Sequence, residues 1–332
     1  MTFLIFGLGS IGQRHVRLLR RERPECRIIA VQERRRQLII HDDLSTSQGD
    51  PVQFYGIESA SLADIESVPA DAGFVTNPIS LHADILRYLV RRGIPAFVEK
   101  PLADRLGDLP ELVGAAGERG CTGYNLRWHP AVEFIKEVLE RQELGRIHEA
   151  KLHFGEWLAG IRTFEDYRQT HMARRDQGGG VTLCLSHEID LARYLFGEPG
   201  EVRAFGGKFS DLEIETEDTL EAILVFKNET AVFPVNLSLN FLDRPTQRWM
   251  VVHGERGVLR WDYFENRVTV KSAEGTVAHT EFPQFYRNLT FERQLKNFLA
   301  VLEGAEKPLC SLQDGLQTLE LCLRLREAAC LS

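Results

Sequence analysis

The chain has 332 residues, of which 43% are hydrophobic, and its 40 basic residues are outnumbered by 48 acidic ones. This length favours two domains over one. The formal net charge of −8 argues against nucleic acid as a main partner, because phosphate binding needs a positive surface. No apolar run approaches the roughly 18 residues that a membrane span requires, and the first predicted strand begins next to Met1, which leaves no room for a signal peptide. We therefore expect a cytoplasmic protein that does not bind membranes.

The chain begins with a predicted strand, a glycine-rich turn and a helix. The apolar strand TFLIF runs into GLGSIG, and apolar side chains then recur at helical spacing to about residue 22. This order predicts a dinucleotide-binding turn, in which Gly7 allows the tight turn, Gly9 lets the backbone approach a pyrophosphate and Gly12 lets the helix pack on the strand. The N-terminus of the helix then faces the phosphates.

A second predicted strand, residues 27–31, ends next to an acid and three arginines. Glu33 follows Gly12 by about 20 residues, the distance at which an acid contacts the adenosine ribose, and this favours NAD. Arg34 and Arg35 would instead bind a 2′-phosphate, which favours NADP. The sequence leaves both cofactors open.

Strands and helices continue to alternate as far as residue 124. Further strand-like runs are VQFYG, AGFVT, IPAFV and CTGY, and helical patterns at residues 82–92 and 108–118 lie between the later ones. Such alternation predicts a parallel, doubly wound sheet. Ligands bind beyond the carboxyl ends of the strands in such a sheet. We therefore expect the residues at those ends to converge on one crevice: Gly7, Glu33, Asn77, Lys100 and Asn125.

The second half of the chain has a different pattern. A helix at residues 130–143 and a strand at residues 147–154 come first, followed by β-rich runs with turns between them, from about residue 202 to residue 282. The runs EAILVF, TAVFPVNLSL, RWMVVH, GVLRW and RVTVK predict an open, largely antiparallel sheet. An uncovered face of that sheet would favour a homodimer or homotetramer.

Two helices, near residues 289–302 and 312–329, close the chain. The predicted fold class is α/β. We expect a doubly wound Rossmann domain at residues 1–122, and at residues 123–332 an α/β domain that binds substrate and is built on the large open sheet.

A polar stretch and three glycines precede a predicted helix that is largely apolar but carries Cys184, His187 and Asp190. Residues 156–177 are weighted towards basic side chains, which favours an anionic substrate because arginine binds carboxylate and phosphate in bidentate fashion. A solvated loop is the alternative. Tyr167, Arg168 and His171 are the candidates for substrate binding in this stretch. The glycines at 178–180 would let the backbone pass close to cofactor or substrate.

Two residues are candidates for proton transfer. Cys184, His187 and Asp190 are three apart and fall within one broad face of the predicted helix, and His187 is either an acid-base group or a hydrogen-bonded core histidine. Lys100 directly follows an apolar strand and is either a solvated lysine or, beside a nicotinamide, a half-buried amine that exchanges a proton. Strand alternation points Glu99 away from Lys100, so Glu99 should support the turn.

Five pieces of sequence, spread over nearly the whole chain, occur together in one known family: GLGSIG, TNPISLHADIL, VEKPLAD, GYNLRWHP with LGRI, and GGGVTLCLSHEIDLARYLFG. With them the chain resembles the glucose-fructose oxidoreductase, inositol dehydrogenase and MocA family of NAD(P)-dependent enzymes. The resemblance implies a Rossmann domain followed by an α/β domain with a large open sheet. It also implies hydride transfer between a nicotinamide and a secondary alcohol of a sugar, without a metal. GLGSIGQRH and SHEID look closest to members associated with cell-surface sugar biosynthesis.

The resemblance assigns roles to individual residues. It implies that Lys100 and His187 are the catalytic pair. The expected cofactor contacts are Gly7, Gly9, Ser10, Ile11, Gly12, Glu33, Arg34, Thr76, Asn77, Pro78, His82 and Glu99. The expected substrate contacts are Asn125, Arg127, Tyr167, Arg168, His171 and Cys184.

Cys184 is a departure from the family pattern, since many members have an aspartate at this position. A thiol lacks the charge and the acceptor capacity of a carboxylate. Either another acid takes over the role, with Glu188, Asp190 and Glu156 as candidates, or activity on the usual polyol is weakened.

Two other functions fit the same residues. A regulator would bind nucleotide and sugar without chemistry; the missing aspartate favours this function, and the presence of Lys100 and His187 opposes it. A lyase or glycosidase would oxidise a sugar transiently and then return the hydride.

Overall fold

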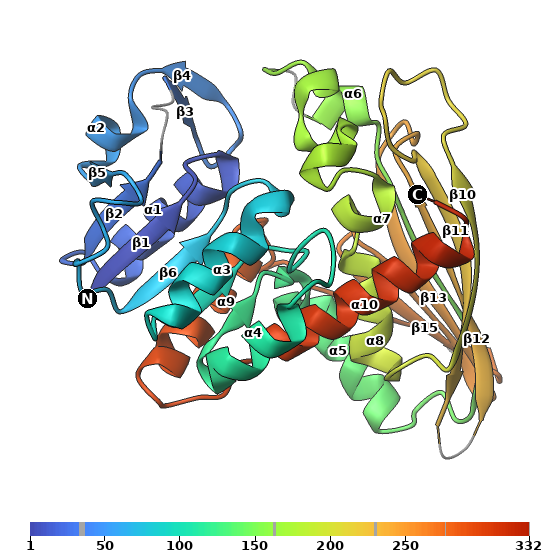
Figure 1. The fold of residues 1–332 in the computed structure, drawn as a ribbon. Helices are drawn as coiled ribbons and strands as arrows, with labels where there is room; N and C mark the ends of the chain where they lie inside the picture. The colour runs from blue at the N-terminus through green and yellow to red at the C-terminus, as the bar shows by residue number, and fades with distance from the viewer. Residues whose placement is uncertain (33–36, 162–163, 229–230, 276, 332) are drawn as a thin grey trace. The chain divides into compact units, whose positions relative to one another are not determined.

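The computed structural model describes residues 1–332 apart from 33–36, 162–163, 229–230, 276 and 332, and the chain divides into two compact units (Figure 1). The first unit comprises Met1–Tyr124 and Thr290–Gln317, and the second comprises Asn125–Leu289 and Thr318–Ser332. The segment Thr290–Gln317 thus groups with the N-terminal part of the chain. A domain boundary after residue 122 stays a prediction.

A six-stranded sheet forms the centre of the first unit. Its order is β5-β2-β1-β6-β7-β8, and each neighbouring pair is parallel, so the predicted doubly wound sheet is confirmed. A two-stranded hairpin, β3-β4, stands beside it. The strands are β1 (Thr2–Phe6), β2 (Arg27–Val31), β3 (Leu38–Ile40), β4 (Thr46–Gln48), β5 (Glu58–Ala60), β6 (Ala72–Val75), β7 (Ala96–Val98) and β8 (Cys121–Thr122). The helices are α1 (Ser10–Glu22), α2 (Pro51–Tyr55), α3 (His82–Arg91), α4 (Leu109–Ala116) and α9 (Leu289–Leu302).

Aromatic rings from distant parts of the chain fill the core of the first unit. Phe74 of β6 and Phe97 of β7 stack with their ring centroids 5.3 Å apart, and Phe298 of α9 packs edge-on against both, at 5.4 and 5.5 Å. All three side chains are fully buried. Helix α9 therefore completes this core, although it follows the second unit in the chain.

The segment VQFYG, predicted to be a strand, is helical instead. Asp50 accepts a hydrogen bond from the backbone N–H of Val52 at 2.8 Å, Pro51 occupies the first turn of α2, and Gly56 ends the helix with a φ of 59°. These are the residue types that begin and end helices. The capping residues outweigh the strand propensity of the short apolar run.

An eight-stranded sheet dominates the second unit. Its order is β10-β11-β12-β9-β13-β14-β15-β16, and every pair except β12-β9 is antiparallel, which confirms the predicted open, mostly antiparallel sheet. The strands are β9 (Ile147–Gly155), β10 (Glu201–Gly207), β11 (Thr219–Lys227), β12 (Val232–Asn240), β13 (Gln247–Gly254), β14 (Gly257–Asp262), β15 (Arg267–Ser272) and β16 (Val277–Glu281). The helices are α5 (Pro130–Glu140), α6 (Leu158–Ile161), α7 (Val181–Cys184), α8 (His187–Phe196) and α10 (Leu312–Ala328), which runs from the first unit into the second.

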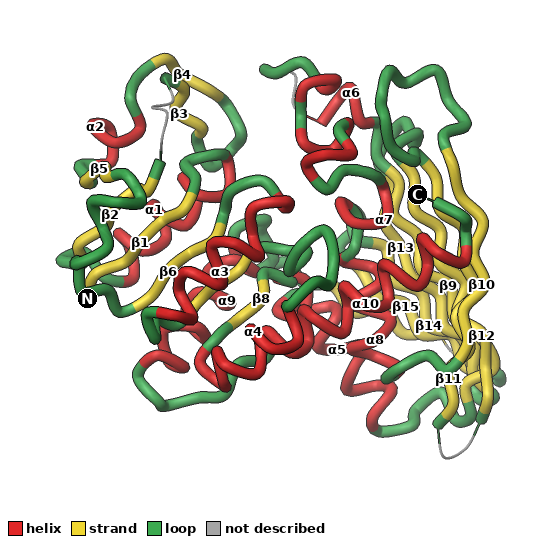
Figure 2. Tube along the Cα trace, viewed as in Figure 1, coloured by secondary structure: helices red, strands yellow, loops and turns green. Residues whose placement is uncertain are grey.

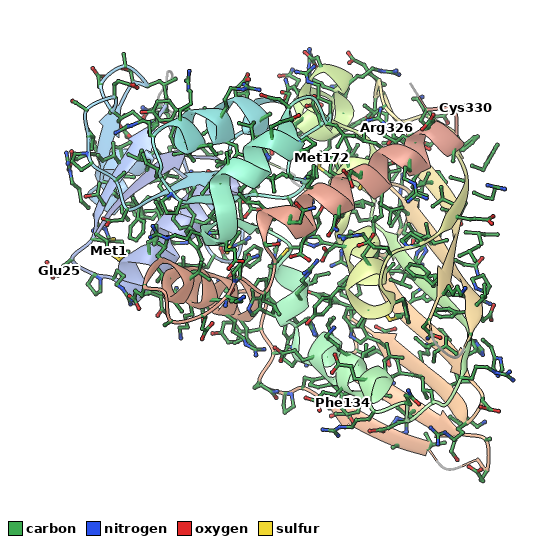
Figure 3. The ribbon with its side chains drawn as sticks, turned by 60° about the horizontal axis from the view of Figure 1, so that its bottom comes forward. Met1, Glu25, Phe134, Met172, Arg326 and Cys330 are labelled. Carbon is green, nitrogen blue, oxygen red and sulfur yellow. The ribbon has the colours of Figure 1, made fainter. Side chains whose placement is uncertain are left out.

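Helices cover one face of this sheet. Figure 2 shows α5, α7 and α8 against it, and buried residues alternate with more exposed ones along β11 and β12. Phe134 of α5, labelled in Figure 3, packs edge-on against Phe282 with the ring centroids 6.2 Å apart. Apolar side chains such as Phe205 and Ile223 remain exposed. Assembly into a dimer or tetramer stays a prediction.

The helix predicted after the three glycines, with Cys184, His187 and Asp190 on one face, is two helices, α7 and α8. Leu185 has a φ of −100° and a ψ of 26°, which departs from helical geometry. Cys184 therefore ends one helix and His187 begins the next, so the two residues do not share the face of a continuous helix. Among the described residues, none of the helices combines the length and apolar character that crossing a bilayer requires.

Candidate active site

Three glycines shape the turn between β1 and α1, each for a different reason. Gly7 has a φ of 101°, and a Cβ there would lie 3.0 Å from the backbone of Asn77. A Cβ at Gly12 would lie only 2.0 Å from the carbonyl oxygen of Gly7, whereas at Gly9 it would meet nothing within 4 Å. Gly7 and Gly12 are thus required by the protein's own packing. Gly9 leaves open space in front of the N-terminus of α1, where an anion is favoured.

The loop after β6 closes against this turn. Thr76 is buried and its hydroxyl donates to the carbonyl oxygen of Gly7 at 2.7 Å. The side-chain oxygen of Asn77 is buried and has no hydrogen-bond partner within the described part of the chain. A buried acceptor without a partner costs free energy. An amide donor of a bound ligand would satisfy it, so these residues fit a nicotinamide cofactor.

His82 connects the loops that follow β6 and β7. Its two ring nitrogens lie 2.9 Å from the carbonyl oxygen of Asn77 and 3.0 Å from that of Pro101. Burial lowers the pKa of His82, although the two carbonyl oxygens oppose this effect. The ring fixes the spacing of these loops, and a contact with the cofactor stays a prediction.

Glu99 and Lys100 follow β7. Glu99 is buried, Lys100 is half-buried, and one carboxylate oxygen of Glu99 lies 3.3 Å from the backbone nitrogen of Lys100, which donates to it. The other oxygen lies 2.9 Å from Nε2 of His15, on α1. Sequence reasoning missed His15. The available signal was a polar side chain three residues beyond Gly12, on the helix face that packs against the sheet.

The other predicted cofactor residues have simpler positions. Ser10 and Ile11 form the first turn of α1 and are half-buried, and Pro78 is exposed. Glu33 and Arg34 lie outside the described residues. The proposed contacts of Glu33 with the adenosine ribose and of Arg34 with a 2′-phosphate stay predictions.

In the second unit, α8 begins with His187, which is half-buried, while Cys184 at the end of α7 is buried. Two of the acids considered as substitutes for the missing aspartate are engaged elsewhere. Glu188 lies 2.7 Å from Arg248, and Asp190 receives two hydrogen bonds from Arg127, at 2.7 and 3.0 Å. The side chains of both ion pairs, Glu188 with Arg248 and Asp190 with Arg127, are at least nine-tenths buried.

The ion pair with Asp190 gives Arg127 a structural role. A buried guanidinium needs such a partner, and removing either one would strand the other charge. The pair ties the segment Asn125–Trp128 to α8, and Asn125 itself is buried. Substrate contacts by Asn125 and Arg127 stay predictions.

The basic side chains before the glycines are balanced by acids. Arg168 hydrogen-bonds to Asp166 and to Glu213, and its guanidinium lowers the pKa of Asp166. Arg174 pairs with Asp176 at 3.1 Å. The hydroxyl of Tyr167, which is half-buried, accepts a hydrogen bond from the backbone of Glu213. His171 is half-buried in the same loop. The excess of positive charge inferred from the sequence is therefore much reduced.

Two of the glycines at 178–180, Gly179 and Gly180, are explained by contacts within the second unit. A Cβ at Gly179 would lie 2.5–2.6 Å from three backbone carbonyl oxygens, one of them that of Met172, labelled in Figure 3. A Cβ at Gly180 would lie 2.3 Å from the carboxylate of Glu217. Packing within the protein therefore requires glycine at these two positions, and the approach of the backbone at 178–180 to a ligand stays a prediction.

The parallel sheet and the glycine turn define a dinucleotide-binding fold of the Rossmann type, and comparison with known proteins agrees. The model of the oxidoreductase family's NAD-binding Rossmann fold matches residues 1–125, and that of the GFO/IDH/MocA C-terminal domain matches residues 132–260. The chain belongs to the Gfo/Idh/MocA family of oxidoreductases, and its first unit is an NAD-binding Rossmann fold.

Individual relatives are distant. The chain is 27% identical over 325 residues to the uncharacterized oxidoreductase YrbE of Bacillus subtilis, covering 94% of this chain and 89% of the relative. It is 22% identical over 335 residues to the inositol 2-dehydrogenase of Rhizobium meliloti, covering 97% and 94%. The crystal structure of the WlbA dehydrogenase from Bordetella pertussis, in complex with NADH and UDP-GlcNAcA, aligns with a TM-score of 0.76 at 20% identity, over 99% of this chain and 96% of that one.

Proposed function

We propose that this protein oxidises a secondary alcohol of a sugar or sugar derivative, or reduces the matching ketone, with Lys100 and His187 as the catalytic pair. The observation that carries the proposal is the space at the carboxyl ends of β1 and β6: Gly9 is open, and the side-chain oxygen of Asn77 is buried without a partner among the described residues. Lys100 follows β7, the strand beside β6.

The residues of the first unit divide the binding of the cofactor among them. The N-terminus of α1 binds the pyrophosphate through backbone N–H groups, as the open space at Gly9 allows. Asn77 accepts a hydrogen bond from the carboxamide. When bound, NAD(P)⁺ accepts the hydride that leaves the alcohol carbon.

Lys100 and His187 act on the hydroxyl proton. In the oxidation, one of the two takes this proton as the hydride leaves, and the other donates a hydrogen bond that stabilises the developing oxyanion. Half-burial suits both roles, because a partly exposed amine or imidazole can reach a substrate hydroxyl and exchange a proton with it.

The structure and the comparisons give opposing indications about whether the substrate is anionic or neutral. The similarity of fold to a dehydrogenase crystallised with UDP-GlcNAcA supports an anionic sugar derivative, such as one used in surface-polysaccharide biosynthesis. The pairing of Arg168 and Arg174 with acids opposes it, because a paired guanidinium binds a second carboxylate or phosphate less well. A neutral polyol and an anionic nucleotide sugar are therefore both candidates.

The test is a screen for cofactor reduction. The purified protein is incubated with NAD⁺ or NADP⁺ and with inositol, simple aldoses or UDP-GlcNAcA, and the nicotinamide absorbance is followed. We expect at least one sugar to give continuous reduction of the cofactor, until the amount of reduced cofactor exceeds the amount of enzyme. Bound cofactor that cycles without net reduction would favour a lyase or glycosidase, and tight NADH binding with no chemistry would favour a regulator.

A further inference from the structure

We propose that His15 is a positioning residue for this reaction: it holds the carboxylate of Glu99 in one orientation beside Lys100. The inference rests on the proposed function, since it gives His15 a role through Lys100. It concerns the first unit alone, in which α1 brings His15 to the end of β7.

The contact between His15 and Glu99 is buried on both sides. Nε2 of His15 lies 2.9 Å from Oε1 of Glu99, and the side chains are 1% and 11% exposed. The imidazole packs against both Phe74 and Phe97, with ring centroids 5.2 and 4.9 Å away. Rings packed in this way have little rotational freedom. The direction of the hydrogen bond to Glu99 is therefore fixed by the core.

The second nitrogen of His15 identifies the tautomer. Nδ1 is buried and has no hydrogen-bond partner within the described part of the chain. An N–H at that position would be an unsatisfied buried donor, which is costly. The proton therefore belongs on Nε2, where it donates to Glu99. The one polar contact of His15 among the described residues is therefore the hydrogen bond that it donates to Glu99, and this bond orients the carboxylate.

The other side of Glu99 is equally constrained. Oε2 accepts a hydrogen bond from the backbone N–H of Lys100 at 3.3 Å, and a Cβ on Gly123 would lie 2.7 Å from the same oxygen. The carboxylate thus fills a gap that glycine leaves open, and it is attached directly to the backbone of the proposed catalytic lysine. A fixed negative charge one residue away favours the ammonium form of Lys100 and restrains its backbone.

The test separates positioning from packing with two substitutions at one site. His15→Phe keeps an aromatic ring in the core and removes the donor, whereas His15→Gln keeps an N–H the same number of bonds from Cα. Tyr88→Phe is the control, because it deletes another hydrogen bond of the first unit, 2.6 Å long, which Arg92 donates to the hydroxyl of the buried Tyr88. Thermal unfolding and NADH affinity are measured for each variant.

The primary readout is the rate at which acetic anhydride acetylates Lys100, and it needs no substrate. Mass spectrometry measures this rate, with Lys151 as internal reference. A buried carboxylate without its donor takes up a proton or turns away, so the ammonium of Lys100 loses support. We expect His15→Phe and Glu99→Gln each to label Lys100 about three to ten times faster, as half to one pH unit of change in its protonation implies. The double variant should label no faster than Glu99→Gln, because both act through one group.

With a sugar that the screen identifies, kcat should fall about 10- to 100-fold in His15→Phe, while KM and NADH affinity stay within about threefold. His15→Gln should keep most of the activity. The inference would be overturned if His15→Phe kept the labelling rate and the kcat of the wild type. It would also be overturned if the effects of His15→Phe and Glu99→Gln on the labelling rate multiplied in the double variant, or if Tyr88→Phe changed labelling and kcat as much as His15→Phe does. Lys100→Met separates the two proposals: if that variant turns over normally, the proposed function fails, and if it is inactive while His15→Phe is normal, only the role of His15 fails.

Discussion

Gly9 and Gly12 are glycines for opposite physical reasons. A Cβ at Gly12 would overlap the carbonyl oxygen of Gly7, whereas a Cβ at Gly9 would point into open space. Gly9 also has a φ of −73°, which any residue can adopt. The motif predicts this difference, and the surroundings of the two Cβ positions agree with it.

Alanine at these two positions should therefore have different effects. Gly12→Ala should lower the free energy of unfolding by about 2 kcal/mol, because the turn must move to admit the methyl group. Gly9→Ala should leave the unfolding midpoint nearly unchanged and weaken NADH binding about tenfold or more, a loss of roughly 1.4 kcal/mol. Urea unfolding and NADH fluorescence measure both effects, and normal NADH affinity in Gly9→Ala would show that the pyrophosphate does not approach there.

His82 should make stability depend on pH. Burial lowers the pKa of His82 from its ordinary value of 6.5, so below that pH the unfolded state binds more protons than the folded state. Its contribution is full above about pH 6.5 and is lost as the pH falls, by up to about 1.4 kcal/mol per pH unit. Urea unfolding between about pH 7.5 and pH 5.5 measures the slope. His82→Gln should flatten it and the exposed control His279→Gln should not; an unchanged slope in His82→Gln would refute this origin.

The sequence predicted the packing roles of Gly7 and Gly12 because a local motif fixes their geometry, while the approach of a pyrophosphate to Gly9 stays a prediction. It was less informative for Arg127 and Arg168, whose acidic partners include residues far along the chain, Asp190 and Glu213. A charged residue that looks free in sequence is often neutralised by a neighbour that only the fold supplies. The same reason hid His15, whose partner Glu99 lies on another element.

Among the elements, two of the predictions made from periodicity differ from the structure. Residues 51–55 have an apolar run typical of a strand, but capping residues at both ends make them helical. Residues 181–196 have helical periodicity throughout, yet the backbone at Leu185 interrupts it. Such breaks arise from tertiary packing, which a one-dimensional pattern does not contain.

Helix α9 was predicted as a helix, but its place in the first unit was not. Phe298→Ala should destabilise the protein by about 3–5 kcal/mol, because it removes a fully buried ring that contacts Phe74 and Phe97. It should also weaken NADH binding, since the same core supports β6 and β7. Phe54→Ala, at a ring 55% exposed, is the matched control and should cost less than about 1 kcal/mol. Equal losses in the two variants would contradict the assignment of α9 to this core.

For the whole molecule, the order of strands and helices was enough to predict an α/β chain with a parallel sheet followed by an open antiparallel one. That prediction held because each half has its own periodicity. The substrate could not be predicted in the same way, because recognition depends on side chains whose partners are set by the fold. Function is therefore best tested at the proposed catalytic groups.

Turnover and NADH binding of Lys100→Met, measured side by side with the wild-type protein on the sugar that reduces the cofactor fastest, test the central claim most directly. Methionine keeps most of the length of the side chain and removes the amine. The account predicts that turnover falls at least about a thousandfold while NADH affinity stays within a few-fold. Wild-type turnover in this variant would contradict the assignment of proton transfer to Lys100.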